Sequence, residues 1–218
     1  AAKFLAEDIR GRRNHLSTGF LGTPYLCHVL TLNGYEDVAY DLLLQETYPS
    51  WLYPVKMGAT TIWERWDGQK TDSTFQDPGM NSFNHYAYGA IGDWMYKSSA
   101  GINYNSPGYK EITIYPHVTK RLDFSRAAFE SPYGLISSGW ERKDGKLVFT
   151  VKIPSNTTAK IFLPTDDISK IKYAGPVSGT KGTKAKQTKD PFTVMLNNKE
   201  KRVEISAGSG EYVFELTE

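Results

Sequence analysis

Disulfides, membrane spans and a strong net charge are all missing from this sequence of 218 residues. Its one cysteine, Cys27, excludes an intrachain disulfide and lies in an apolar helical pattern that predicts a buried core position. No stretch is apolar over the roughly 18 residues that a membrane-spanning helix needs, so no membrane partner is expected. The formal net charge of +2 points to neither an acidic nor a basic partner.

Clusters of basic residues are also scarce. The one modest run lies between Lys181 and Lys189, where Gly and Thr residues interrupt it. This composition is typical of a solvent-exposed loop and not of a nucleic-acid-binding patch, so no nucleic-acid partner is expected. The N-terminus has no charged-then-apolar signal pattern. Leu5 and Ile9 repeat at helical spacing with no capping residue before them, which indicates a chain that begins inside a helix, as a piece of a longer protein would.

The residues that are present have an ordinary globular composition, with 39% hydrophobic and 23% charged side chains. This length fits one large domain or two small ones. Helical periodicity predicts helices over residues 2–12, 20–32 and 35–45, a short helix or turn over 49–57, and a long helix over 82–96. About five helices would make less than half of an α/α toroid.

The spacing of apolar residues changes from helical to alternating after the Ser-, Asn- and Gly-rich segment 98–107. Asp144-Gly145 predicts a hairpin turn between two alternating runs. The change predicts a helical domain over residues 1–108 and an antiparallel β-sandwich domain over residues 109–218. Strands are expected over residues 111–115, 134–142, 146–153, 158–163, 192–196, 202–205 and 212–216.

A carboxylate between two indoles stands at the centre of the helical part. Within the stretch Gly58–Gly68, Glu64 follows Trp63 and precedes Trp66 by two residues. Indole faces can stack on a sugar ring, and a carboxylate can activate a water molecule, which together are typical of a carbohydrate-cleaving site. The structural alternative is a buried pair of Glu64 and Arg65 in an aromatic core.

Four motifs in a fixed order then support a resemblance. They are Gly19–Pro24 (GFLGTP), Pro49–Tyr53 (PSWLY), the stretch Gly58–Gly68, and Asn84–Gly89 (NHYAYG). Together they resemble the C-terminal half of the bacterial α-L-rhamnosidases of glycoside hydrolase family 78. The resemblance covers about residues 1–120, and the remaining residues are similar in kind to the β-sandwich that closes these enzymes.

The resemblance implies a partial (α/α)6 barrel followed by a β-sandwich, and inverting hydrolysis of terminal α-L-rhamnose from glycosides or polysaccharides. It implies that Glu64 is the general base, that His85 contacts the sugar hydroxyls, and that no metal or other cofactor is needed. Trp63 and Trp66 are candidates for sugar stacking, although two such close neighbours are not expected to face the cleft together. The compartment stays open: periplasmic or secreted, or cytoplasmic in a bacterium.

Other side chains near these motifs have lesser expected roles. Asp67 is an alternative catalytic carboxylate, and Arg65 is expected to brace a carboxylate. His85 could instead be a helix-capping or core histidine. Core positions are expected for Tyr53, Tyr86 and Tyr88, and no role is assigned to His15, His28 or His117.

The sequence departs from the family pattern at the general acid. The family's acid is a Glu in a stretch resembling D-x-x-x-R-x-E followed by Trp and Asp, and no such stretch occurs here. Because inverting hydrolysis needs two carboxyl groups, the chain is expected to be inactive alone. An incomplete toroid would expose an apolar face, which predicts self-association or an upstream segment that completes the barrel. The alternatives are a non-catalytic carbohydrate-binding or interaction protein, and another (α/α)6-barrel glycosidase.

Overall fold

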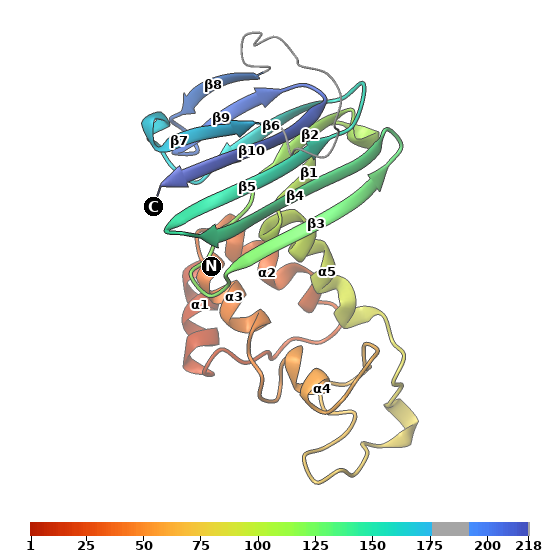
Figure 1. Cartoon of the computed structure of the whole chain (residues 1–218). Coiled ribbons are helices and arrows are strands. Elements are labelled where there is room, and N and C mark those ends of the chain that lie inside the picture. Colours follow the sequence, from red (N-terminus) through yellow and green to blue (C-terminus); the bar gives the residue numbers. More distant parts are fainter. Residues whose placement is uncertain (176–191, 218) are drawn as a thin grey trace. The chain divides into compact units, whose positions relative to one another are not determined.

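The computed structural model describes residues 1–175 and 192–217, so the basic run between Lys181 and Lys189 lies outside the described residues. The chain divides into two compact units, Ala1–Trp94 and Met95–Glu218. The first unit is helical and the second is a β-sandwich, which confirms the predicted fold class (Figure 1). No helix among the described residues is long and apolar enough to cross a membrane.

Three helices form the compact part of the first unit: α1 (Ala2–Gly11), α2 (Thr23–Leu32) and α3 (Glu36–Leu43). Glu36 and Asp37 occupy the first turn of α3, where negative charge stabilises the partly positive helix end. The helix α2 packs against α3. Cys27 is buried in α2, as predicted, and this burial raises the pKa of its thiol to about 12.

The rest of this unit is mostly irregular. It contains α4 (Leu52–Lys56), two 3-10 turns, η1 (Pro78–Met80) and η2 (Ala87–Ala90), and the single turn α5 (Ile91–Trp94). The long helix predicted over residues 82–96 is wrong at its start, because residues 82–86 are not helical; the helical run begins at Ala87 and continues through η2, α5 and the π turn η3 (Met95–Ser99). The backbone of Ser82 and His85 instead bonds to the segment around Glu64. These tertiary hydrogen bonds outweigh the local helical periodicity.

Several apolar side chains of the helical unit remain on its surface. Phe4, Leu21, Tyr25 and Leu32 are between 68% and 90% exposed. Single exposed apolar residues are common, but several large ones on one small unit leave considerable apolar area in water. Coverage by a second copy or by an upstream segment stays a prediction.

The second unit contains two five-stranded sheets, in the orders β1-β2-β6-β9-β8 and β3-β4-β5-β10-β7 (Figure 1). All described strand pairs are antiparallel except β2 with β6, which is parallel and was not predicted. The first sheet comprises β1 (Ile102–Tyr104), β2 (Glu111–Ile114), β6 (Thr158–Leu163), β8 (Phe192–Asn197) and β9 (Arg202–Ala207). The second comprises β3 (Phe124–Ser131), β4 (Gly134–Lys143), β5 (Lys146–Ile153), β7 (Ile171–Gly175) and β10 (Gly210–Thr217). The strands β1, β3 and β7 were not predicted, and β1 lies inside the segment 98–107.

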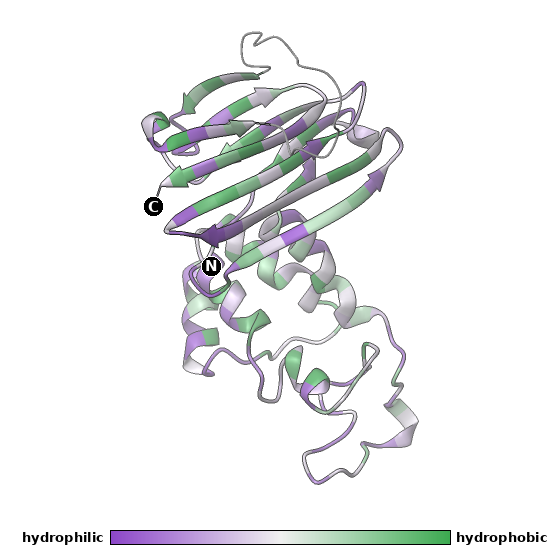
Figure 2. Ribbon diagram, viewed as in Figure 1, coloured by the Kyte–Doolittle hydropathy of each residue, from purple (hydrophilic) through white to green (hydrophobic). Residues whose placement is uncertain are grey.

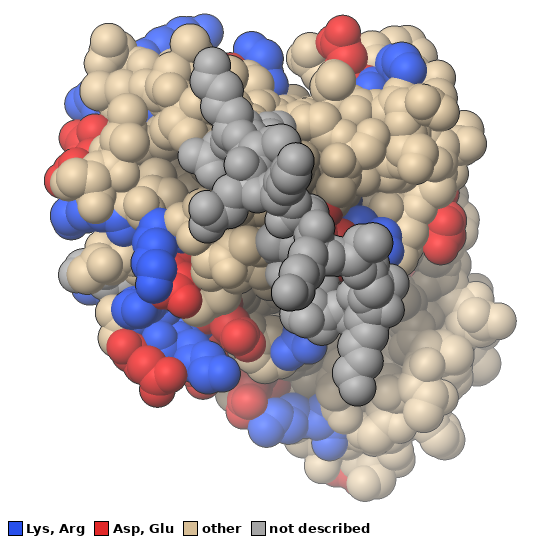
Figure 3. Space-filling model, turned by 45° about the horizontal axis from the view of Figure 1, so that its top comes forward, with Lys and Arg blue, Asp and Glu red and all other residues tan. Residues whose placement is uncertain are grey.

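Alternate residues of both sheets pack together into one core. Hydrophobic residues recur along the neighbouring strands β5 and β10 (Figure 2). The hairpin between β4 and β5 turns at Asp144 and Gly145, whose φ angles of 51° and 74° fit the predicted tight turn. On the face shown in Figure 3, acidic and basic side chains are intermixed.

Gly101 is a position where only glycine fits. Its φ angle is +87°, and an added Cβ would lie 2.4 Å from the backbone nitrogen of Pro116. We expect Gly101→Ala to lower the free energy of unfolding by more than the roughly 1–2 kcal/mol cost of positive φ alone. Gly108→Ala is the matched control, because Gly108 has a φ angle of +75° but open space around it. Equal losses for the two variants in urea unfolding would contradict the steric argument.

We expect His117 to make the stability of the sandwich dependent on pH. Burial, with a smaller contribution from the Arg202 charge, lowers the pKa of His117 to about 4. A histidine in an unfolded chain has a pKa of about 6.5, so the unfolded state binds more protons between these values. Stability is therefore full above about pH 6.5 and falls as the pH drops towards 4.

Replacing His117 with Gln should flatten this part of the stability profile. The wild type is expected to lose up to about 3 kcal/mol more than the variant between pH 7 and 4. Urea unfolding measured across that pH range provides the comparison. Parallel profiles for the two proteins would show that His117 does not drive the acid sensitivity.

Candidate active site

Two distant motifs of the helical unit lie side by side through backbone hydrogen bonds. The N–H of Glu64 donates to the carbonyl of Ser82 at 2.9 Å, and the N–H of His85 donates to the carbonyl of Ile62 at 2.8 Å. The hydroxyl of Thr61 also donates to the carbonyl of Phe83. The stretch Gly58–Gly68 is thus held against the NHYAYG segment, although neither forms a long helix or a strand there.

The Glu64 carboxylate is half-buried and held at one oxygen. Its Oε2 accepts a hydrogen bond from the N–H of Ser82 at 2.8 Å. Among the described residues, no other hydrogen bond or ion pair reaches this carboxylate. One oxygen is therefore fixed in orientation, while the other is free to bind a water molecule.

Glu64 lies on the wall of a cavity of about 390 Å³. Such a volume falls within the usual range for small-molecule sites. Aromatic and charged side chains share the lining, which consists of Gly19, Phe20, Tyr48, Glu64, Arg65, Trp66, Asp67, Met80 and Tyr88. Phe20, Tyr48 and Met80 were not singled out from the sequence. Phe20 belongs to the GFLGTP motif, which was the one available signal for it.

Of the two candidate tryptophans, only Trp66 lines this cavity. Its ring stacks on Tyr88 with centroids 3.6 Å apart and meets the ring of Trp51 edge-on at 5.6 Å. Trp63 is 6% exposed and packs edge-on against Phe83 at 5.1 Å. The expectation that both indoles would not face the cleft together agrees with this arrangement.

The neighbouring charges are already engaged with each other. Arg65 Nε lies 3.7 Å from Asp67 Oδ1, so Arg65 braces a carboxylate as predicted. The other oxygen of Asp67 accepts a hydrogen bond from the amide of Gln76. Because both oxygens have partners, Asp67 is less free than Glu64 to bind and activate water.

His85 lies beside the cavity and is not among its lining residues. Its ring stacks on Phe20 at 4.8 Å, and its Nδ1 accepts the N–H of Ala87 at the start of η2. It therefore acts as a capping histidine, the structural alternative considered above. With Nδ1 as acceptor, the neutral ring carries its proton on Nε2, which remains available to a hydroxyl group.

The tyrosines differ from one another. Tyr53 is buried, and its hydroxyl donates to the carbonyl of Gln69 at 2.9 Å. Tyr88 is 7% exposed, and burial raises the pKa of its phenol, so it stays a neutral hydrogen-bond donor at the cavity wall. Tyr86 is 88% exposed, so its predicted core position is wrong.

The two histidines without an assigned role lie outside this cavity. His28 pairs with Asp93 at 2.9 Å, and His15 bonds to Thr47 at 2.7 Å.

Comparison with known proteins matches each of the two parts of the chain to a known domain family. Residues 1–98 match the model of the bacterial α-L-rhamnosidase 6-hairpin glycosidase domain, and residues 101–177 match that of the bacterial α-L-rhamnosidase C-terminal domain. An α-L-rhamnosidase of Streptomyces avermitilis is 47% identical over 173 residues, which are 79% of this chain and 17% of that protein. One from Formosa agariphila is 43% identical over 215 residues, which are 99% of this chain and 22% of that protein.

Solved structures agree with the sequence matches. The crystal structure of Streptomyces avermitilis α-L-rhamnosidase complexed with L-rhamnose superposes with a TM-score of 0.82 and 40% identity, over 99% of this chain and 19% of that one. The α-L-rhamnosidase of Aspergillus terreus gives a TM-score of 0.78 and 30% identity, over 99% of this chain and 21% of that one. This chain thus spans about a fifth of these relatives. It belongs to the bacterial α-L-rhamnosidase family, with its helical unit in the six-hairpin domain and its sandwich in the C-terminal domain.

Proposed function

We propose that this chain supplies the general-base side of an inverting α-L-rhamnosidase site, with Glu64 as the base. The observation that carries the proposal is the Glu64 carboxylate on the cavity wall, with one oxygen held by Ser82 and the other without a described partner. The substrate class rests on the relatives, one of which is described in complex with L-rhamnose. The substrate would be a terminal α-L-rhamnoside of a glycoside or polysaccharide.

In the proposed reaction, the free oxygen of Glu64 accepts a proton from water as that water attacks the anomeric carbon. The glycosidic C–O bond breaks, and its oxygen takes a proton from a general acid on the opposite face of the sugar. Inverting enzymes place these two carboxyl groups about 6.5–9.5 Å apart. Asp67 is a poor candidate for the acid because Arg65 and Gln76 already engage its two carboxylate oxygens. The general acid is therefore proposed to lie outside this chain.

The aromatic wall would position the sugar. Trp66 presents an indole to the cavity, and its stacking on Tyr88 fixes its orientation. The Nε2–H of His85 would donate to a sugar hydroxyl, because Nδ1 is already occupied by Ala87. Trp63 would act indirectly, since its packing against Phe83 supports the segment beside Ser82.

Hydrolysis of p-nitrophenyl α-L-rhamnoside by this chain alone is the direct test. No turnover is expected alone, and turnover is expected when the rest of the barrel is supplied. Turnover by the isolated chain would show that one of its own carboxyl groups serves as the acid. A parallel screen of other aryl glycosides tests the sugar, and preference for a sugar other than rhamnose would contradict the proposed substrate.

A further inference from the structure

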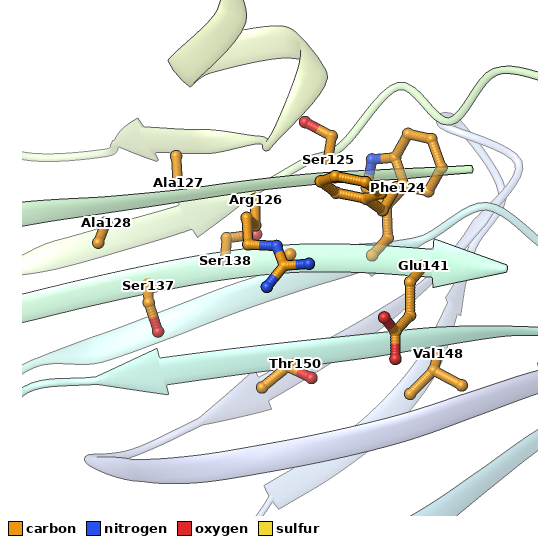
Figure 4. A pocket seen from close by; sticks show the side chains of 12 residues that line it. Phe124, Ser125, Arg126, Ala127, Ala128, Ser137, Ser138, Glu141, Val148 and Thr150 are labelled. Atoms are coloured by element: carbon orange, nitrogen blue, oxygen red, sulfur yellow. The ribbon is translucent and has the colours of Figure 1, made fainter. Parts of the chain in front are cut away.

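A second and slightly larger cavity lies in the sandwich, far from the Glu64 motif in sequence. Its volume is about 430 Å³, and the strands β3, β4 and β5 form it (Figure 4). Outward-facing residues of these strands pair across the sheet, with Arg126 opposite Gly139 and Phe124 opposite Glu141. On the other side of β4, Gly139 lies opposite Thr150 of β5. All of these residues belong to the second unit.

The floor of this cavity depends on Gly139. An added Cβ at this position would lie 3.1 Å from the Arg126 Cβ and 3.3 Å from the Ser125 carbonyl oxygen. Neighbouring floor positions carry only Ala128 and Ser137. The small residues leave a depression in the sheet face, and larger side chains stand around it (Figure 4).

The rim carries two charged groups of opposite sign that are not paired with each other. The Arg126 guanidinium lies 4.7 Å from the centroid of the Phe124 ring, which is its one described contact. The Glu141 carboxylate has no hydrogen bond or ion pair among the described residues. Both side chains point over the same sheet face (Figure 4). Elsewhere on this face the charges do pair, as with Lys152 and Glu211 at 2.8 Å.

We infer that this depression is a non-catalytic binding site for a neutral pyranose unit of a saccharide. A guanidinium supplies several fixed donors and a carboxylate supplies only acceptors, so the pair matches neighbouring hydroxyl groups that both donate and accept. Phe124 is 52% exposed and offers an apolar surface for the C–H groups of a ring. The two rim charges cancel, which favours a neutral ligand over a phosphate or a uronate. This site is separate from the proposed catalytic function and does not require it.

Nuclear magnetic resonance of the isotope-labelled 218-residue chain tests the site directly. The probes are L-rhamnose, D-xylose and D-galactose, with D-galacturonate as the charged comparison. At least one neutral sugar should give saturable shifts at the amides of Arg126, Gly139 and Thr150, and galacturonate should bind more weakly. Absence of shifts on β3–β5 with all neutral sugars at tens of millimolar would overturn the inference.

Matched variants locate the binding. Arg126→Met and Glu141→Gln should each weaken sugar binding at least tenfold, because each removes charge-assisted hydrogen bonds. Lys152→Met and Glu211→Gln, on the same sheet face but outside the cavity, should leave binding unchanged. Unfolding midpoints control for folding, and both rim side chains are accessible enough to be replaced. Equal effects of rim and control variants would overturn the inference.

Two further outcomes separate this site from others. Glu64→Gln should leave the β3–β5 shifts intact, so failure of the proposed catalytic role would not remove them. Shifts confined to residues around Glu64 would place the only sugar site there and overturn the inference. Sedimentation tests whether the chain self-associates through this face. If Arg126→Met abolishes self-association and no sugar binds, the face belongs to a contact with a second copy of the chain instead.

Discussion

In a complete rhamnosidase that contains this chain, Glu64→Gln is expected to lower kcat by about 100- to 10,000-fold, the usual contribution of a general base. Glutamine has nearly the same shape and can still accept the Ser82 N–H with its amide oxygen. It cannot take a proton from water at neutral pH. Rhamnose binding should therefore stay measurable, and the loss should appear in kcat and not in the dissociation constant.

Asp67→Asn is the matched control for that experiment. It removes a carboxylate from the same cavity, but one already engaged by Arg65 and Gln76. We expect less than about a tenfold change in kcat, because an exposed or half-exposed ion pair of this kind contributes little free energy. Normal turnover by Glu64→Gln would remove Glu64 from the mechanism. A larger loss for Asp67→Asn would transfer the role of base to Asp67.

The largest expected loss of stability concerns Phe214 in β10. Its side chain is fully buried and lies among the rings of Tyr173, Phe192 and Tyr212, which come from both sheets. Phe214→Ala should lower the free energy of unfolding by about 3–5 kcal/mol, through lost burial and the cavity that remains. Since whole domains are stable by only about 5–15 kcal/mol, this is a large fraction of the total.

Phe124→Ala provides the same chemical change at a surface position of the same unit. Phe124 is 52% exposed, so its removal should cost less than about 1 kcal/mol in urea unfolding, most of it from the lost contact with Arg126. Similar losses for the two variants would mean that the ring cluster around Phe214 is not the tightly packed core of the sandwich.

The sequence predicts those elements whose signal is local. The β4–β5 hairpin depends on Asp144 and Gly145, and it forms where the alternating runs and the turn residues place it. The helix predicted over residues 82–96 is wrong at residues 82–86 for the opposite reason. Its first residues bond to the backbone of Ile62 and Glu64, which are distant in sequence, and no periodicity reports such a contact.

The candidate site shows the same limit. The motif around Glu64 identifies the carboxylate, because the residues that point to a sugar site are adjacent in the sequence. The sequence does not show which way each indole faces. Only the folded chain shows that Trp66 lines the cavity while Trp63 packs on Phe83. Phe20 and Tyr48 join the same wall from other segments, so their place depends on tertiary packing alone.

The parallel pairing of β2 with β6 has a consequence for how the sandwich can come apart. In sequence, β3, β4 and β5 of the opposite sheet lie between β2 and β6. The strand β10 belongs to that opposite sheet as well, although it follows β8 and β9 of the first sheet. Any break between Phe124 and Ala207 therefore divides both sheets at once. Because each sheet takes strands from both the early and the late part of the unit, we expect the unit to unfold in a single cooperative step. Its many contacts between distant residues should also make it the slower-folding part of the chain.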